Sequence, residues 1–561
     1  MTLTQPESRA NLAAYCRMQF SLARKPSVAH LLLLLIVFSG PATAQTSVSK
    51  VWIADNGDGT YRNPILHADY SDPDVVRVGD DFYLVASSFN AVPGLPILHS
   101  RDLVNWTIIS PALPRQPPLD VFSKPQHGNG VWAPAIRYHN AEFYIFYPDP
   151  DYGIYMIKAR DPVGPWSEPL LMKAAKGWID PCPFWDDDGK AYLITAFARS
   201  RTGIKSILVL SRMSEDGTKL LDDGVMVFDG HEQDPTVEGP KLYKRNGYYY
   251  IFAPAGGVES GWQLALRSKN IYGPYERRVV LAQGKTNING PHQGAWVETQ
   301  TGESWFIHFQ DKGAYGRVVH LQPMKWVNDW PIIGISPNRD GTGEPVLTNR
   351  KPSVGRSYPI STPPDSDEFN EQRIGLQWQW QANPQSNWAF PSAAYGFLRL
   401  LAVPLPSDAR NFWDIPNPLL QKFPAPAFTA TTKVAFTARN EGERTGLIIM
   451  GLDYAYLSVQ KRPDGLYISQ TICQNADQGL AEKETAAVKL EGGTFWLRVR
   501  VQENAACSFS FSTDGKTFVP LGQSFKARPG RWIGAKVGIF AVGKTPAAEM
   551  GYADYDWFRI E

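Results

Sequence analysis

The sequence predicts an all-β protein in which a five-bladed β-propeller precedes a β-sandwich of the jelly-roll type. A hairpin pattern occurs five times between residues 75 and 309, and the chain is rich in aromatic and turn-forming residues, with 27 Phe, 24 Tyr, 18 Trp, 47 Gly and 45 Pro. After about residue 340 the pattern stops, and a Pro- and Ser-rich stretch follows at 349–369. A chain of 561 residues is too long for a single hydrophobic core, so we expect more than one domain. We place a signal peptide at 1–44, a propeller at 45–345, a linker at 346–365 and a sandwich at 366–561.

An apolar run occupies residues 29–39, AHLLLLLIVFS, after Arg24 and Lys25. It is too short to cross a bilayer, which takes about 20 residues. The small residues of Pro41-Ala42-Thr43-Ala44 follow it, as in a secretory signal peptide. We therefore expect cleavage after Ala44, export to the periplasm or the medium, and no stable membrane insertion afterwards.

The charge balance argues against nucleic acid as a partner. The whole chain has 56 Lys and Arg against 55 Asp and Glu, and 52 against 54 remain beyond residue 44. Binding to a phosphate backbone needs a basic patch, and this sequence has no basic block.

Cysteine usage fits an exported chain. Cys16 would leave with the signal peptide, and Cys182, Cys473 and Cys507 would remain. An odd number permits one disulfide. We expect it between Cys473 and Cys507, because both lie in the C-terminal third, with Cys182 as a buried thiol.

Each repeat places a Gly, Asn or Asp turn between two alternating apolar strands, the signature of a β-hairpin. The copies span 75–88, 135–148, 183–197, 241–254 and 295–309. Aligning the turns superposes Tyr83, Tyr144, Tyr192, Tyr250 and Phe306. A second, more polar hairpin follows each copy, so the unit has four strands and five units close a propeller. One large sandwich with chance similarity is the competing interpretation.

Three carboxylic acids precede or open the innermost strands of the repeats. They are Asp72, before the first copy, Asp180, before the third, and Glu238, before the fourth. Pro or Gly-Pro follows each acid, which disfavours a helix at that point. Side chains at these equivalent positions should converge on the propeller axis. Convergent carboxyl groups suit glycoside hydrolysis, in which one acid protonates the leaving oxygen and an ionised partner activates water, and nearby like charges keep the proton on the acid.

These segments resemble glycoside hydrolase family 43 from about Asn63 to Trp330, and the C-terminal region resembles the concanavalin A-like sandwich of its β-xylosidase-like members. The family segment with the general base is similar to NPILHADYSDPDVV, and the segment with the general acid is similar to TVEGPKLYKRNGYYYIF. The family segment whose Asp tunes the pKa of the general acid and orients substrate is similar to IDPCPFWDDDGKAYL. The resemblance maps the general base to Asp72, the general acid to Glu238 and the tuning role to Asp180. It implies an inverting reaction without a cofactor, and a carboxyl separation of about 6.5 to 9.5 Å.

Further positions match family residues around the sugar. The resemblance implies that Phe89 and Trp132 stack on the sugar face and that Arg317 contacts substrate, with blade packing or an ion pair as their structural alternatives. It also implies that His292 lies on the axis, beside substrate or as a metal ligand. His127 is a possible neighbour of the pocket.

The expected function is exo-acting release of terminal β-D-xylosyl or α-L-arabinofuranosyl residues from hemicellulose-derived oligosaccharides or polysaccharides. Asn90-Ala91-Val92 stands where related β-xylosidases have an aromatic pair, which should widen the pocket wall or shift the stacking platform and strengthens the arabinofuranosidase interpretation without deciding between the two sugars. An endo-arabinanase and a non-catalytic carbohydrate-binding protein are two competing interpretations. In the sandwich, Asp367, Glu368 and Asp556 are candidate ligands of a structural calcium ion.

Overall fold

The computed structural model describes residues 48–335, 341–544 and 548–561, which lie in one compact unit. The predicted signal peptide lies outside these residues. No helix among the described residues is long and apolar enough to cross a membrane.

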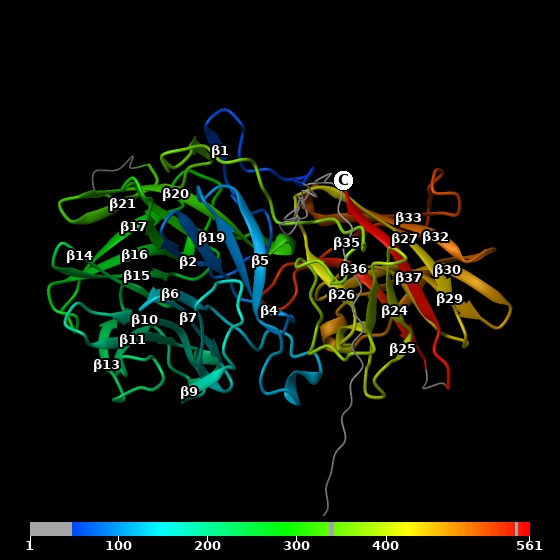
Figure 1. Ribbon diagram of the computed structural model, residues 1–561, viewed down its shortest axis with the longest axis horizontal. Coiled ribbons are helices and arrows are strands. Elements are labelled where there is room, and N and C mark those ends of the chain that lie inside the picture. The colour runs from blue at the N-terminus through cyan, green and yellow to red at the C-terminus, as the bar shows by residue number, and fades with distance from the viewer. Residues whose placement is uncertain (1–47, 336–340, 545–547) are drawn as a thin grey trace, which may run out of the picture. The chain divides into compact units, whose positions relative to one another are not determined.

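Five antiparallel four-stranded sheets form the blades of a propeller, coloured from blue to green in Figure 1. Blade 1 contains β2 (Asp74–Val78), β3 (Asp81–Val85), β4 (Gly94–Ser100) and β5 (Trp106–Leu113). Blade 2 contains β6 (Ala135–His139), β7 (Glu142–Asp149), β8 (Gly153–Ala159) and β9 (Leu170–Ala174). Blade 3 contains β10 (Trp178–Trp185), β11 (Ala191–Phe197), β12 (Ile207–Met213) and β13 (Val225–Asp229). Blade 4 contains β14 (Lys241–Arg245), β15 (Tyr248–Ala255), β16 (Trp262–Ser268) and β17 (Glu276–Ala282). Blade 5 contains β18 (His292–Glu298), β19 (Ser304–Asp311), β20 (Arg317–Val327) and β21 (Trp330–Ile333).

The sequence repeat corresponds to the first two strands of every blade. The repeated aromatic residue lies on the second strand and pairs with the first, as Tyr83 does with Val76 and Tyr250 with Tyr243. The predicted propeller is therefore confirmed strand by strand. A short ladder between β1 (Thr60–Arg62) and β22 (Thr348–Arg350) joins the segments that enter and leave the propeller.

The innermost strands of blades 3 and 5 are irregular where they carry functional residues. The register shifts between Ile179 and Cys182 in β10, and between His292 and Gly294 in β18. A bulge of this kind redirects one side chain out of the alternating pattern. Here the redirected residues are Asp180 and Gln293, both with positive φ.

The C-terminal strands form a sandwich of two sheets, coloured from yellow-green to red in Figure 1. One sheet contains β23 (Ala389–Ser392), β24 (Phe397–Leu401), β37 (Tyr552–Ile560), β27 (Phe428–Thr437), β32 (Thr494–Val501), β33 (Ala506–Ser512), β34 (Val519–Pro520) and β35 (Phe525–Lys526). The other contains β25 (Val403–Pro404), β36 (Lys536–Gly543), β26 (Leu419–Lys422), β28 (Arg444–Met450), β29 (Tyr454–Arg462), β30 (Gly465–Cys473) and β31 (Lys483–Leu490). The predicted sandwich is thus confirmed.

Helical turns are few among the described residues. They are α1 (Arg199–Thr202), η1 (Val121–Ser123), η2 (Gly313–Tyr315), η3 (Phe412–Asp414), η4 (Ala476–Gln478) and η5 (Glu503–Ala505). Of these, η2 matters most for the site, because its Tyr315 packs in the sandwich core and Gly316 and Arg317 follow it directly.

The expected disulfide between Cys473 and Cys507 is wrong. Both residues, like Cys182, are buried free thiols. Cys473 lies on β30 of one sheet and Cys507 on β33 of the other, and each packs in a different apolar cluster. Two cysteines that are close in the sequence therefore lie on opposite layers of the sandwich.

The candidate calcium ligands of the sandwich are engaged elsewhere. Asp367 accepts hydrogen bonds from three N–H groups, including the indole of Trp378 at 2.9 Å. Glu368 pairs with Arg559 at 2.7 Å, and Asp556 with Lys433 at 2.6 Å. These three carboxylates do not form a cation site, and the described residues contain no group of three His, Cys, Asp or Glu side chains arranged for a metal.

Candidate active site

A cavity of about 120 Å³ gathers all seven predicted site residues. Its lining consists of Asp72, Phe89, Trp132, Ala133, Ile179, Asp180, Glu238, His292, Gln293, Arg317 and Trp532. The acids come from blades 1, 3 and 4, so the convergence predicted from equivalent repeat positions occurs.

Asp72 lies two residues before β2 and is held by three neighbours. Its Oδ2 accepts hydrogen bonds from the hydroxyls of Ser71 at 2.7 Å and Ser87 at 2.6 Å, and Nη1 of Arg317 lies 3.1 Å from Oδ1. The backbone has φ of 54°, a left-handed conformation that Asp tolerates better than most residues. The side chain is thus an oriented acceptor, as a base that takes a proton from water must be.

Asp180 shares the left-handed conformation, with φ of 55°, and is 2% exposed. Its Oδ2 accepts a hydrogen bond from the N–H of Gly239 at 2.7 Å, which ties it to the residue after Glu238. Burial, followed by the negative charge of Asp72, raises the pKa of Asp180 to about 6, although the Gly239 bond opposes this. Left-handed backbone at both aspartates is strain of the kind concentrated at functional sites.

Glu238 is the strongest candidate for a proton donor. Burial, the charge of Asp180 and the charge of Asp72 raise its pKa to about 8, against the opposing effect of Arg317. The side chain remains 32% exposed because it faces the cavity. A carboxyl group of this kind carries its proton at neutral pH while a substrate can still reach it.

His292 lies beside the proton donor as a neutral imidazole. It is 1% exposed, and burial, assisted by Arg317, lowers its pKa to about 3. Its Nε2 lies 3.3 Å from Oε1 of Glu238, but neither ring nitrogen forms a hydrogen bond with the described residues. Both nitrogens are thus buried without a partner among the described residues, and the metal-ligand role of His292 stays a prediction.

Three aromatic rings form the wall of the pocket. The rings of Phe89 and Trp132 lie 6.5 Å apart, and those of Trp132 and Trp532 lie 6.3 Å apart at a steep angle. Phe89 is fixed by reciprocal backbone hydrogen bonds with Val131. Trp532 comes from a loop of the sandwich and is 53% exposed. Sequence reasoning missed Trp532, because an aromatic residue between Gly530 and Gly534 is its only local signal.

Two further expectations from the sequence are wrong. His127 does not line the pocket: it stacks on Trp413 of the sandwich, with ring centroids 3.6 Å apart. Asn90 and Val92 do not widen the pocket wall either, because Asn90 donates a hydrogen bond to the carbonyl of Gln381 and Val92 bridges to Trp380. Asn90 and Val92 therefore contact the sandwich and do not line the catalytic pocket.

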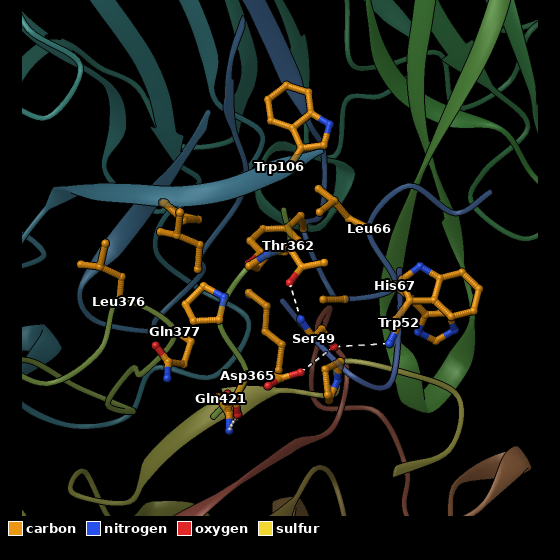
Figure 2. A pocket seen from close by; sticks show the side chains of 18 of the residues that line it. Ser49, Trp52, Leu66, His67, Trp106, Thr362, Asp365, Leu376, Gln377 and Gln421 are labelled. Atoms are coloured by element: carbon orange, nitrogen blue, oxygen red, sulfur yellow. Dashed lines mark hydrogen bonds between the residues drawn. The ribbon is translucent and has the colours of Figure 1, made fainter. Parts of the chain in front are cut away.

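A second cavity, of about 70 Å³, lies where blade 1, the N-terminal segment and the segment 361–365 meet the sandwich (Figure 2). Ser49 closes one side through hydrogen bonds to Thr362 and Asp365. His67 lines it between the rings of Trp52, at 4.9 Å, and Tyr315, at 5.4 Å. Because none of the three acids lines this cavity, it is not the catalytic pocket.

Comparison with known proteins agrees with this site. Residues 61–331 match the model of glycosyl hydrolases family 43, and residues 366–561 match the β-xylosidase C-terminal concanavalin A-like domain. A putative β-xylosidase of Xylanibacter ruminicola is 41% identical over 500 residues, covering 87% of this chain and 88% of the relative. The chain belongs to glycosyl hydrolase family 43.

Further members of family 43 extend the similarity over nearly the whole chain. A β-xylosidase of Formosa agariphila is 32% identical, covering 97% of this chain and 98% of the relative. A crystal structure of a family 43 protein from Bacillus licheniformis superposes with a TM-score of 0.78 at 28% identity, covering 89% of this chain and 99% of that one. Family 43 membership makes this protein a glycosidase with the fold of the family's exo-acting enzymes.

Proposed function

We propose that this glycosidase removes terminal pentosyl residues, β-D-xylosyl or α-L-arabinofuranosyl, from hemicellulose-derived glycans with inversion at the anomeric carbon. The observation that carries the proposal is the pairing of an oriented acceptor, Asp72, with a carboxyl group, Glu238, whose pKa is raised to about 8 in the same cavity. The two groups need no cofactor, because one accepts a proton and the other donates one.

In the proposed reaction, Asp72 takes a proton from a water molecule as the water oxygen attacks the anomeric carbon. Glu238 gives its proton to the glycosidic oxygen as the bond between that oxygen and the anomeric carbon breaks. Asp180 keeps Glu238 protonated through its charge and holds Gly239 through its hydrogen bond. The attack and the departure occur on opposite faces of the sugar, so the released sugar has the inverted configuration.

Pocket size supports action on chain ends. A cavity of about 120 Å³ is small beside the roughly 300–1,000 Å³ of pockets for larger ligands, so it suits one sugar unit. Trp532 of the sandwich stands at the wall, where an endo-arabinanase needs an open groove. A non-catalytic binding protein has no need of a proton donor poised near neutral pH.

The sugar itself is proposed from relatives. The two relatives described above are named putative β-xylosidase and β-xylosidase, and a relative from Bacteroides ovatus, 28% identical, is named a non-reducing end α-L-arabinofuranosidase. We therefore place β-D-xylosyl first and α-L-arabinofuranosyl second. We also propose that the protein is exported, because residues 29–44 have the pattern of a signal peptide.

Initial rates on 4-nitrophenyl β-D-xylopyranoside and α-L-arabinofuranoside test the function. On xylobiose, whose leaving sugar needs a proton, Glu238→Gln and Asp72→Asn should each lower kcat by orders of magnitude with an unchanged circular dichroism spectrum. Proton NMR of the sugar first released from a β-xyloside should show the α anomer. Release of the β anomer would overturn inversion, and turnover of internal arabinan bonds alone would favour an endo-acting enzyme. N-terminal sequencing of the exported protein tests cleavage after Ala44.

A further inference from the structure

A buried aspartate outside the catalytic group joins the propeller to the sandwich behind the pocket. Asp69 is 3% exposed and lies three residues before Asp72. Its Oδ1 accepts a hydrogen bond from the N–H of Arg317 at 2.8 Å, and its Oδ2 accepts one from the N–H of Gly534 at 3.0 Å. One carboxylate therefore holds a backbone amide from each domain.

The two backbones that Asp69 holds are in direct contact. A Cβ atom on Gly316 would lie 2.5 Å from the carboxylate of Asp69, and a Cβ atom on Gly534 would lie 2.8 Å from the nitrogen of Gly316. Ala535 donates a hydrogen bond to the carbonyl of Ala314 at 2.7 Å beside them. The junction therefore has no room for a side chain at either glycine, and the carboxylate of Asp69 packs directly against it.

Both segments lead directly into the catalytic pocket. Arg317, whose amide binds Asp69, places Nη1 between the hydroxyl of Ser71 at 2.8 Å and Asp72 at 3.1 Å. Gly534 lies in the loop before β36 that also carries Trp532, whose ring lines the same pocket. Asp69 is thus hydrogen-bonded to the residue that contacts the base and to the loop that supplies one pocket wall.

Two lysines of the sandwich lie within electrostatic reach of Asp69. Lys422 and Lys536 face each other in the β26–β36 ladder, and neither ammonium group forms a hydrogen bond or ion pair with a described residue. Asp69 is the acid whose charge acts on both. Burial and the charge of Lys422 lower the pKa of Lys536 to about 7, and Asp69 opposes that effect.

We propose that Asp69 is a positioning residue for hydrolysis, which fixes Arg317 against Asp72 and the Trp532 loop against the pocket at the same time. Docking of the sandwich then sets the geometry around the catalytic base. The kinetic part of this inference rests on the proposed function, whereas the structural part does not.

Asp69→Asn tests the kinetic part. The amide keeps one acceptor but turns an N–H donor toward one of the two backbone N–H groups, so one hydrogen bond becomes a donor–donor contact. We expect kcat per folded molecule on 4-nitrophenyl β-D-xylopyranoside to fall about 10- to 100-fold, the effect of losing a hydrogen bond to a charged group. We also expect KM for xylobiose to rise, because its leaving sugar would meet the Trp532 loop. A structural role alone would lower the yield of folded enzyme and leave both constants unchanged.

Asp408→Asn is the matched control, because Asp408 of the sandwich pairs with Lys124 of the propeller at 2.6 Å and both side chains are exposed. It makes the same chemical change at the same domain junction, away from the pocket, and should leave kcat and KM unchanged. Equal kinetic constants for Asp69→Asn and the wild type would overturn the inference.

Hydrogen–deuterium exchange gives a readout that does not need turnover. Peptides that contain Arg317 or Gly534 should exchange faster in Asp69→Asn than in the wild type. In Asp408→Asn, the same peptides should exchange at the wild-type rate. Unchanged exchange in both peptides would overturn the inference, whatever the activity. If Asp69→Asn does not fold, Gly534→Ala takes its place, since its methyl group would push on Tyr315 and Gly316. Wild-type protein inactive on every pentoside would refute the proposed function, and exchange would still decide the role of Asp69.

Discussion

The pH dependence of activity should depend on the charge of Asp180, and Asp180→Asn tests this. At pH 7, a glutamic acid with a pKa of 4.5 is protonated in about 0.3% of molecules, whereas a pKa of about 8 protonates Glu238 in about 90%. The protein environment therefore increases the population of the proton donor roughly 300-fold. The charge of Asp180 is the second largest cause, after burial.

The direction in which activity changes with pH follows from the role of Glu238 as a proton donor. Activity is present while Glu238 holds its proton and is lost as the pH rises through its pKa, so the wild type should lose kcat/KM above about pH 8. Removing the charge of Asp180 lowers that pKa, and the alkaline limb should move down by roughly one pH unit.

The assay is kcat/KM on xylobiose from pH 4 to pH 10, because its leaving sugar needs a proton from Glu238 and this parameter reports the ionisations of the free enzyme. Asp408→Asn provides a control with the same change of residue at an exposed ion pair, and its profile should superpose on that of the wild type. An alkaline limb that stays in place in Asp180→Asn would show that the charge of Asp180 does not keep the proton on Glu238, and a wild-type limb near pH 5 would show that the pKa of Glu238 is not raised.

Three further predictions concern residues outside the catalytic acids. Trp532→Ala should raise KM for xylobiose, because the ring lines the pocket, and should change the thermal midpoint little, because the ring is 53% exposed. An unchanged KM would contradict this prediction. Lys536→Met should stabilise the protein by more than about 1 kcal/mol in urea unfolding at pH 6, since it removes a buried ammonium group that has no ion-pair partner among the described residues. Between pH 7 and pH 10 Lys536 is protonated in the unfolded chain but has lost its proton in the folded protein. The free energy of unfolding of the wild type should therefore rise over this range, and Lys536→Met should reduce its dependence on pH. Reducing agent should leave the thermal midpoint unchanged, because Cys473 and Cys507 are free thiols, and a shift of several degrees would indicate a disulfide.

The repeat and the catalytic acids could be predicted from the sequence because both follow from local patterns. Alternating apolar residues around a turn define a hairpin, and five such hairpins at similar spacing define blades. Equivalent positions of successive blades face the same axis, so Asp72, Asp180 and Glu238 had to converge. Motif similarity added Phe89, Trp132, Arg317 and His292.

Only the tertiary structure determined what the sandwich contributes to the site. Trp532 and Gly534 lie more than 200 residues from the pocket residues they contact, and no periodicity relates the two regions. The same applies to His127, which stacks on Trp413, and to Cys473 and Cys507, which lie on opposite sheets. Local pattern determines which face of a strand is buried, but the partner across a domain junction depends on how two complete domains pack together.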